Sequence, residues 1–119
     1  MTILAIETTG KTCGVCAVRT NEHGSFELLA IHELYRENVH DEQLALLVQQ
    51  CLASAELTID AIDVVAVSAG PGSFTGTRIG LALAKGLCYT NTPRLLLVDT
   101  MHAMAEASRE VAQLAEADT

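Results

Sequence analysis

Three short runs of β-prone residues open the chain, at positions 3–7, 13–19 and 26–35. Polar segments that contain glycine separate these runs, at positions 8–12 and 21–25. Runs of this kind, joined by short polar turns, are typical of β-hairpins. We therefore expect three consecutive strands at the start of the chain, with the first two paired antiparallel.

From residue 41 onward the pattern changes to alternating helices and strands. Apolar residues within positions 41–55 recur at helical spacing, namely Leu44, Leu47, Val48 and Cys51. The runs at 64–68 and 94–99 predict two buried strands, the first of them apolar on both faces. Helices are expected at 75–89 and from 100 to at least 110. The order βββαβαβα predicts an α/β fold with a mixed sheet, the ribonuclease H-like arrangement.

The length of 119 residues suits a single domain. We assign positions 1–107 to one ribonuclease H-like lobe. Positions 108–119 are more polar and carry no helix C-cap signal, so they are expected to be a tail or the start of a second lobe.

The charge balance bears on possible partners. Fifteen acidic residues against seven basic ones give a formal net charge of -8, which opposes direct binding to a phosphate backbone. We therefore expect the chain to meet RNA only through a partner.

The start has no basic n-region, no long uncharged apolar stretch is present, and the four cysteines sit in apolar runs like buried thiols. These features predict a cytoplasmic protein with no membrane segment.

A glycine-rich segment, SAGPGSFTGTRIGLALAKGL at 68–87, is the most specific signal in the chain. We expect its first part to reverse the chain between a strand and a helix, through Gly70, Pro71 and Gly72. Ser73 or Thr75 can cap the helix. An anion at the helix N-terminus is the alternative, but the spacing fits neither a P-loop nor a dinucleotide-binding fingerprint. We therefore expect no cofactor here.

Small residues recur inside the helix that follows. Gly76, Gly80 and Ala84 lie four apart on one helix face. Each interior glycine costs roughly 1 kcal/mol in helix propensity relative to alanine, so close packing must offset the loss. We expect one face of this helix to pack on the lobe's own sheet and another to be free for a partner.

Candidate metal and catalytic residues do not form a recognised pattern. Cys13 and Cys16 are an odd number of residues apart, which places them on opposite faces of a strand. His32 begins a zincin-like motif, but Arg36 occupies its second histidine position. His40 could be a general base at a helix start, although a solvated end group is the simpler interpretation. We expect no catalytic, metal-binding or cofactor-binding residue.

Three features together resemble the bacterial TsaB (YeaZ) family: the first strand ILAIETT, the sequence HDE at 40–42, and the long glycine-rich segment. This resemblance implies a fold of the actin, sugar kinase and heat-shock chaperone ATPase superfamily, which has two ribonuclease H-like lobes. The present chain covers the N-terminal lobe only. The resemblance also implies a part in the synthesis of threonylcarbamoyladenosine on tRNA, as a non-catalytic partner of the transferase TsaD.

The resemblance further implies that the ATPase TsaE joins a larger complex. From helical spacing we expect the surface that would dock TsaD to be usable for a homodimer when TsaD is absent. TsaD carries two metal-binding histidines where this chain has Thr100 and Met104, so we do not expect transferase activity. The alternative is a metal- or nucleotide-dependent enzyme of the same superfamily, either a threonylcarbamoyl transferase or a glycoprotease-like peptidase.

The two helices expected at 41–55 and 75–89 supply the predicted docking surface for TsaD. Helical spacing turns a partly apolar set of residues outward, and the resemblance places the partner interface on these helices. The expected interface residues are Asp41, Ala45, Leu46, Gln49, Arg78, Leu81, Ala82, Lys85 and Tyr89.

Overall fold

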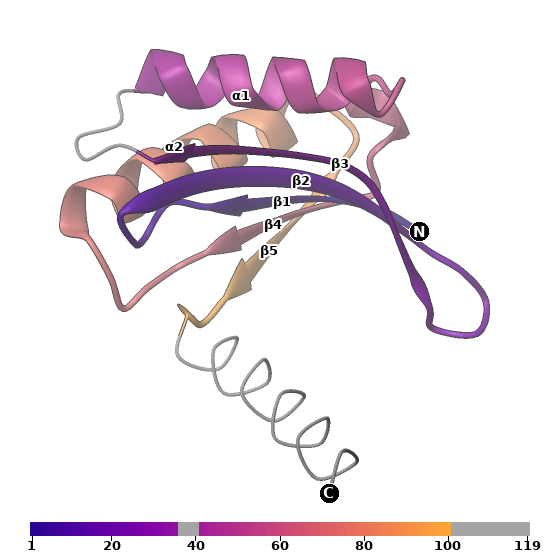
Figure 1. Ribbon diagram of the computed structural model, residues 1–119, viewed down its shortest axis with the longest axis horizontal. Coiled ribbons are helices and arrows are strands. Elements are labelled where there is room, and N and C mark those ends of the chain that lie inside the picture. Colours follow the sequence, from indigo (N-terminus) through magenta and orange to yellow (C-terminus); the bar gives the residue numbers. More distant parts are fainter. Residues whose placement is uncertain (36–40, 101–119) are drawn as a thin grey trace, which may run out of the picture.

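The computed structural model describes residues 1–35 and 41–100, which form a five-stranded sheet and two helices (Figure 1). The strands are β1 (Thr2–Glu7), β2 (Thr12–Thr20), β3 (Phe26–Tyr35), β4 (Val64–Ser68) and β5 (Arg94–Val98). The helices are α1 (Asp41–Ser54) and α2 (Phe74–Thr90), and a short 3-10 turn, Ile59–Ala61, precedes β4.

The sheet order is β3-β2-β1-β4-β5. Strand β1 pairs antiparallel with β2, and β2 pairs antiparallel with β3, because tight turns join them. Strand β4 is parallel to both β1 and β5, and α2 makes the crossover between β4 and β5. This mixed sheet with its packed helices confirms the predicted ribonuclease H-like lobe of the actin, sugar kinase and heat-shock chaperone ATPase superfamily.

Both helices cover the same face of the sheet (Figure 1). Helix α1 packs on β2 and β3, and α2 packs on β4 and β5. The buried core lies between these layers: Leu4, Ile6, Val15, Val65 and Val67 from the strands, and Leu44, Val48 and Cys51 from α1. The helical spacing that predicted α1 from these apolar positions is therefore confirmed.

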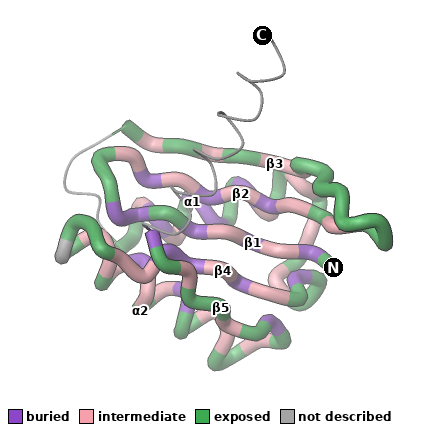
Figure 2. The backbone as a smooth tube through the Cα atoms, turned by 90° about the horizontal axis from the view of Figure 1, so that it is seen from below, coloured by how far each residue is buried: buried purple, intermediate pink, exposed green. Residues whose placement is uncertain are grey.

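The opposite face of the sheet, which we call the open face, is seen in Figure 2. No described element covers it. Val65 and Val67 of β4 are buried beneath the helices, whereas Val64 and Ala66, which point the other way, are only half-buried. The expectation that β4 is buried on both faces therefore does not hold within residues 1–35 and 41–100.

The element boundaries lie close to those expected, with α2 beginning at Phe74 instead of residue 75 and ending one residue later. The helix expected from 100 to 110, and the positions 108–119 assigned to a tail or second lobe, lie outside the described residues apart from Thr100. Across the described part of the chain, neither α1 nor α2 has the length and apolar character needed to cross a membrane.

Candidate functional site

The glycine-rich segment forms the turn and helix start that the sequence predicts. Gly70 has a φ of 104°, a conformation that favours glycine, and a cis peptide bond joins it to Pro71. Ser73 is the N-cap of α2, and its hydroxyl accepts a hydrogen bond from the Gly76 amide at 3.3 Å. The turn is held to the end of β5 because the Thr100 amide donates to the Gly70 carbonyl at 2.9 Å.

Glycines in α2 and just before its N-cap allow the β1–β2 turn to approach the backbone closely. A Cβ atom at Gly72 would lie 2.6 Å from the Thr9 carbonyl oxygen, and Cβ atoms at Gly76 and Gly80 would collide with Thr8. The Thr8 hydroxyl donates to the Gly76 carbonyl at 2.6 Å. The glycine face of α2 therefore packs within the lobe, as expected, with the β1–β2 turn as its specific neighbour.

This packing uses backbone donors that an anion at the start of α2 would need. The Ser73 amide donates to the Thr9 carbonyl at 2.7 Å, and the Gly76 amide donates to the Ser73 hydroxyl. Glu7 is the last residue of β1, next to this turn, and its carboxylate accepts hydrogen bonds from the amide and the hydroxyl of Thr9. The nearby negative charge and the occupied amides both disfavour a phosphate group at this helix N-terminus.

A shallow groove runs between the N-terminal halves of α1 and α2. Its lining combines the carboxylates of α1, the guanidinium of Arg78 on α2, and apolar or small side chains: Asp41, Glu42, Ala45, Arg78, Ile79, Ala82 and Leu83. Ile79 and Leu83 also pack against the core, so they form the floor of the groove. Because Ala45 and Ala82 are small, another helix could approach this groove closely.

Most of the expected interface residues are indeed exposed. The exposed set is Asp41, Leu46, Gln49, Arg78, Ala82, Lys85 and Tyr89, with Ala45 half-buried beside it. Leu46 keeps 52% of its surface accessible although it is apolar. The groove contains only part of the set, because Leu46, Gln49, Lys85 and Tyr89 do not line it.

Leu81 departs from the expected outward orientation. It is half-buried and packs against the core. The reason lies in helix geometry, since residues three apart share a helix face and Ala84, three residues later, is fully buried. Leu81 is therefore a packing residue at the edge of the helix–sheet layer.

The cysteines are free thiols, as their apolar surroundings suggested. Cys13 is buried on the helix side, whereas Cys16 pairs in register with Ala5 on the open face, so the two point to opposite sides. Burial raises the pKa of the Cys13 thiol, with the charge of Glu7 adding to the effect, and burial likewise raises the pKa of Cys16. Both thiols are held in the protonated form, which is a poor metal ligand.

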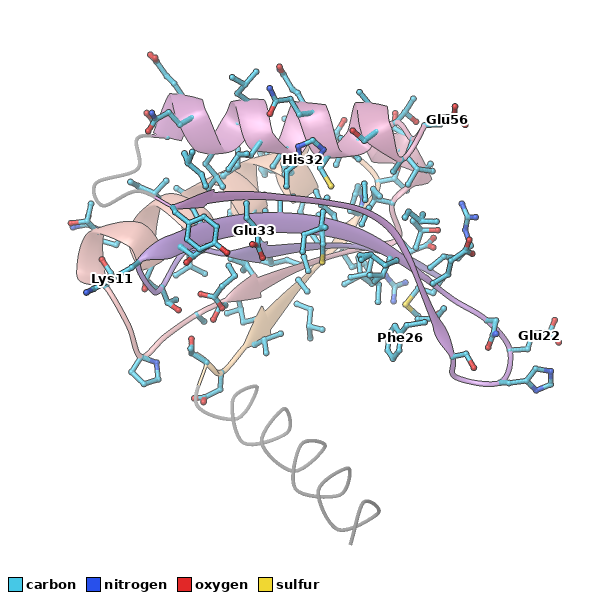
Figure 3. All side chains as sticks on the ribbon, viewed as in Figure 1. Lys11, Glu22, Phe26, His32, Glu33 and Glu56 are labelled. Carbon is cyan, nitrogen blue, oxygen red and sulfur yellow. The ribbon has the colours of Figure 1, made fainter. Side chains whose placement is uncertain are left out.

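Of the histidines considered as candidate metal or catalytic residues, His32 makes a structural contact, and the others lie outside the described residues. His32 projects from β3 toward α1, where its ring Nε2 lies 3.0 Å from the Ser54 hydroxyl (Figure 3). Arg36, His40, His102 and Met104 are outside the described residues. Within the described part of the chain, no three histidine, cysteine or carboxylate residues gather where they could hold a metal ion.

Sequence reasoning missed the contribution of the β1–β2 turn and of Ser68. Thr8 and Thr9 are buried polar residues at the α2 N-terminus, and the Ser68 and Thr100 hydroxyls share a buried hydrogen bond of 2.5 Å. A pair of threonines after a strand is an ordinary turn signal, so nothing local could have shown that these residues meet α2.

The sequence matches a family model and several known proteins. Residues 35–117 match the model of the family TsaD, tRNA N6-adenosine threonylcarbamoyltransferase. The chain is 34% identical to the tRNA threonylcarbamoyladenosine biosynthesis protein TsaB of Escherichia coli, over 91% of its own length and 44% of that protein. It is 29% identical to the TsaB protein of Haemophilus influenzae, over 95% of this chain and 45% of the relative.

A solved structure of YeaZ from Pseudomonas aeruginosa superposes with a TM-score of 0.69 at 28% identity, covering 82% of this chain and 43% of that one. Other relatives carry the transferase name of the family model. The chain spans less than half the length of the TsaB relatives that it matches. The shared sequence and the shared lobe together show that the chain belongs to the TsaB (YeaZ) branch of the family that the TsaD model describes.

Proposed function

We propose that this chain belongs to a non-catalytic subunit in the synthesis of threonylcarbamoyladenosine on tRNA, which supports the transferase TsaD by binding it. The groove between α1 and α2 carries the proposal. It joins an apolar floor, Ile79 and Leu83, to charged side chains at its rim, and Ala82 leaves room for a close helix–helix contact. A groove of this shape suits a pair of helices from a related lobe, so the contact would be a four-helix arrangement.

The surroundings of Thr100 favour a supporting role over a catalytic one. The resemblance to TsaD relatives places a metal-binding histidine at this position. The Thr100 side chain is instead buried and hydrogen-bonded to Ser68, and its amide holds the Gly70 carbonyl. A hydroxyl engaged in this way cannot take the place of an imidazole on iron or zinc.

The alternative function is a threonylcarbamoyl transferase or a glycoprotease-like peptidase that uses a metal or a nucleotide. The matching family model and several relatives are named as transferases, which favours this alternative. Under this alternative the other half of such a protein would have to supply the metal ligands and the nucleotide contacts.

The remaining partners follow from the same proposal. The ATPase TsaE joins a larger complex, and tRNA is reached through TsaD because the net charge of -8 opposes direct binding. In the absence of TsaD, the same helices mediate a homodimer. The compartment is the cytoplasm, where tRNA substrates are modified.

Reconstituted modification of tRNA tests the proposal. The assay contains tRNA, threonylcarbamoyl-AMP and TsaE, with TsaD and this protein added singly or together. We expect transfer only when TsaD is present, and a higher rate when this protein is added to it. Transfer by this protein in the absence of TsaD would establish the catalytic alternative.

A further inference from the structure

Strand β5 forms one edge of the sheet, and its outer side carries backbone groups that no described element pairs. Arg94 and Val98 direct their peptide groups inward, because the Arg94 amide donates at 3.0 Å and the Val98 carbonyl accepts at 2.8 Å in bonds to the residues that flank β4. Peptide groups alternate in direction along a strand. Leu95 and Leu97 therefore turn their N–H and C=O groups toward the outer side of β5.

The opposite edge of the sheet is protected in a way that β5 is not. Strand β3 is irregular, with a register shift opposite Ala17 and Val18, and it carries exposed carboxylates at Glu27 and Glu33. Bulges and charges of this kind discourage pairing with another chain. Strand β5 pairs with β4 in unbroken register, and its only charged residue, Arg94, is its first. The β5 edge is therefore open to a further strand.

Leucine side chains are exposed on both faces of β5, at the border of the sheet (Figure 2). Leu95 and Leu97 are in register with Val65 and Val67, so they lie on the face that the helices cover. Helix α2 packs mainly on β4, and Leu97 keeps 54% of its surface accessible. Leu96 lies on the open face and keeps 51%. A strand added beside β5 would cover both of these side chains.

From these observations we propose that β5 pairs antiparallel with β5 of a second copy of this chain, about a twofold axis at Leu96. In this register Leu95 of each copy lies opposite Leu97 of the other, and each such pair exchanges both backbone hydrogen bonds. The two Leu96 side chains meet at the axis on the open face. The sheet then continues from one copy into the next.

The β5 edge is complementary to itself, which identifies the occupant as a second copy. The outward peptide groups of Leu95 and Leu97 are placed symmetrically about Leu96, as a twofold contact requires. The exposed Leu97 side chain packs beside the half-buried Leu95 of the other copy. Arg94 lies opposite Val98 of the other copy, so no like charges face each other across the strands.

This contact is separate from the groove between α1 and α2, whose lining includes no residue of β5. It therefore does not use the surface proposed to bind TsaD or to form a homodimer through the helices. The proposal stands whether or not the function proposed above is correct.

Disulfide formation between copies tests the register directly. Leu96→Cys places the two new thiols on residues whose Cα atoms are about 4.5 Å apart, within the range that a disulfide spans. Arg94→Cys is the matched control on the same strand and face, because its two copies lie about 13 Å apart along the paired strands. Both chains are oxidised with diamide, and covalent dimer is followed on non-reducing gels.

We expect Leu96→Cys to form covalent dimer at least about tenfold faster than Arg94→Cys, since only the first pair can meet. Equal rates, at the level that the four native cysteines give in the unaltered chain, would overturn the proposal.

A second substitution in the Leu96→Cys chain locates the contact. Leu97→Lys places a charge beside Leu95 of the other copy and should slow the crosslink about tenfold, whereas Leu46→Lys, at a similarly exposed leucine of α1, should leave it unchanged. Addition of TsaD should also leave the crosslink unchanged. Slowing by Leu46→Lys or by TsaD, with no effect of Leu97→Lys, would show that the copies meet through the helices and would overturn the proposal.

Discussion

Gly76 and Gly86 lie on the same helix and carry the same intrinsic cost, yet their surroundings differ. A side chain at Gly76 would collide with the backbone carbonyl of Thr8, whereas a side chain at Gly86 would meet no atom within 4 Å. Only the first glycine is required by a close approach of two segments. The distinction is invisible in the sequence, where both positions read as glycine within an apolar helix.

This contrast predicts opposite effects of two alanine substitutions. We expect Gly86→Ala to raise the free energy of unfolding by up to about 1 kcal/mol, since alanine is the better helix former. Gly76→Ala should lower it by about 1 to 3 kcal/mol, because α2 must move away from the β1–β2 turn. Urea denaturation followed by circular dichroism measures both. Equal stabilisation by the two substitutions would show that the β1–β2 turn is not in close contact with α2 at Gly76.

At the scale of secondary-structure elements, hydrogen bonds join helix α2 to the β1–β2 turn. The Thr8 hydroxyl is buried and donates to the Gly76 carbonyl, and the Ser73 amide donates to the Thr9 carbonyl. These bonds set where α2 begins, and hence where Arg78 and Ala82 stand at the groove. The position of the candidate interface therefore depends on a turn that takes no part in it.

Thr8→Val keeps the shape of this side chain and removes its hydroxyl. We expect a loss of about 1 kcal/mol in the free energy of unfolding, the usual contribution of one intramolecular hydrogen bond. Thr90→Val is the matched control, because the Thr90 hydroxyl also bonds a helix carbonyl, that of Gly86, but at an exposed position. If Thr8→Val lowered the free energy of unfolding no more than Thr90→Val does, the Thr8–Gly76 hydrogen bond would not be what holds the turn against α2.

At the scale of the whole molecule, the order of elements and the fold class could be predicted because strands and helices differ in hydrophobic period. Which residues contact each other across the fold could not be predicted from the sequence. Thr8 and Gly76 are 68 positions apart, and no local pattern links them. Leu81 was expected on the outer surface for the same reason: its burial depends on how far the sheet extends beneath α2.

The central claim is that the groove between α1 and α2 binds TsaD. Calorimetric titration of TsaD with this protein tests it most directly, using Ala82→Arg in the groove and Ala53→Arg, at an exposed position of α1 outside the groove lining, as the control. We expect Ala82→Arg to weaken binding by about 2 kcal/mol or more, roughly 30-fold, because a large charge would be buried in the contact. Ala53→Arg should bind like the unaltered protein. Equal affinities for all three proteins would contradict the account and place the TsaD contact on another surface.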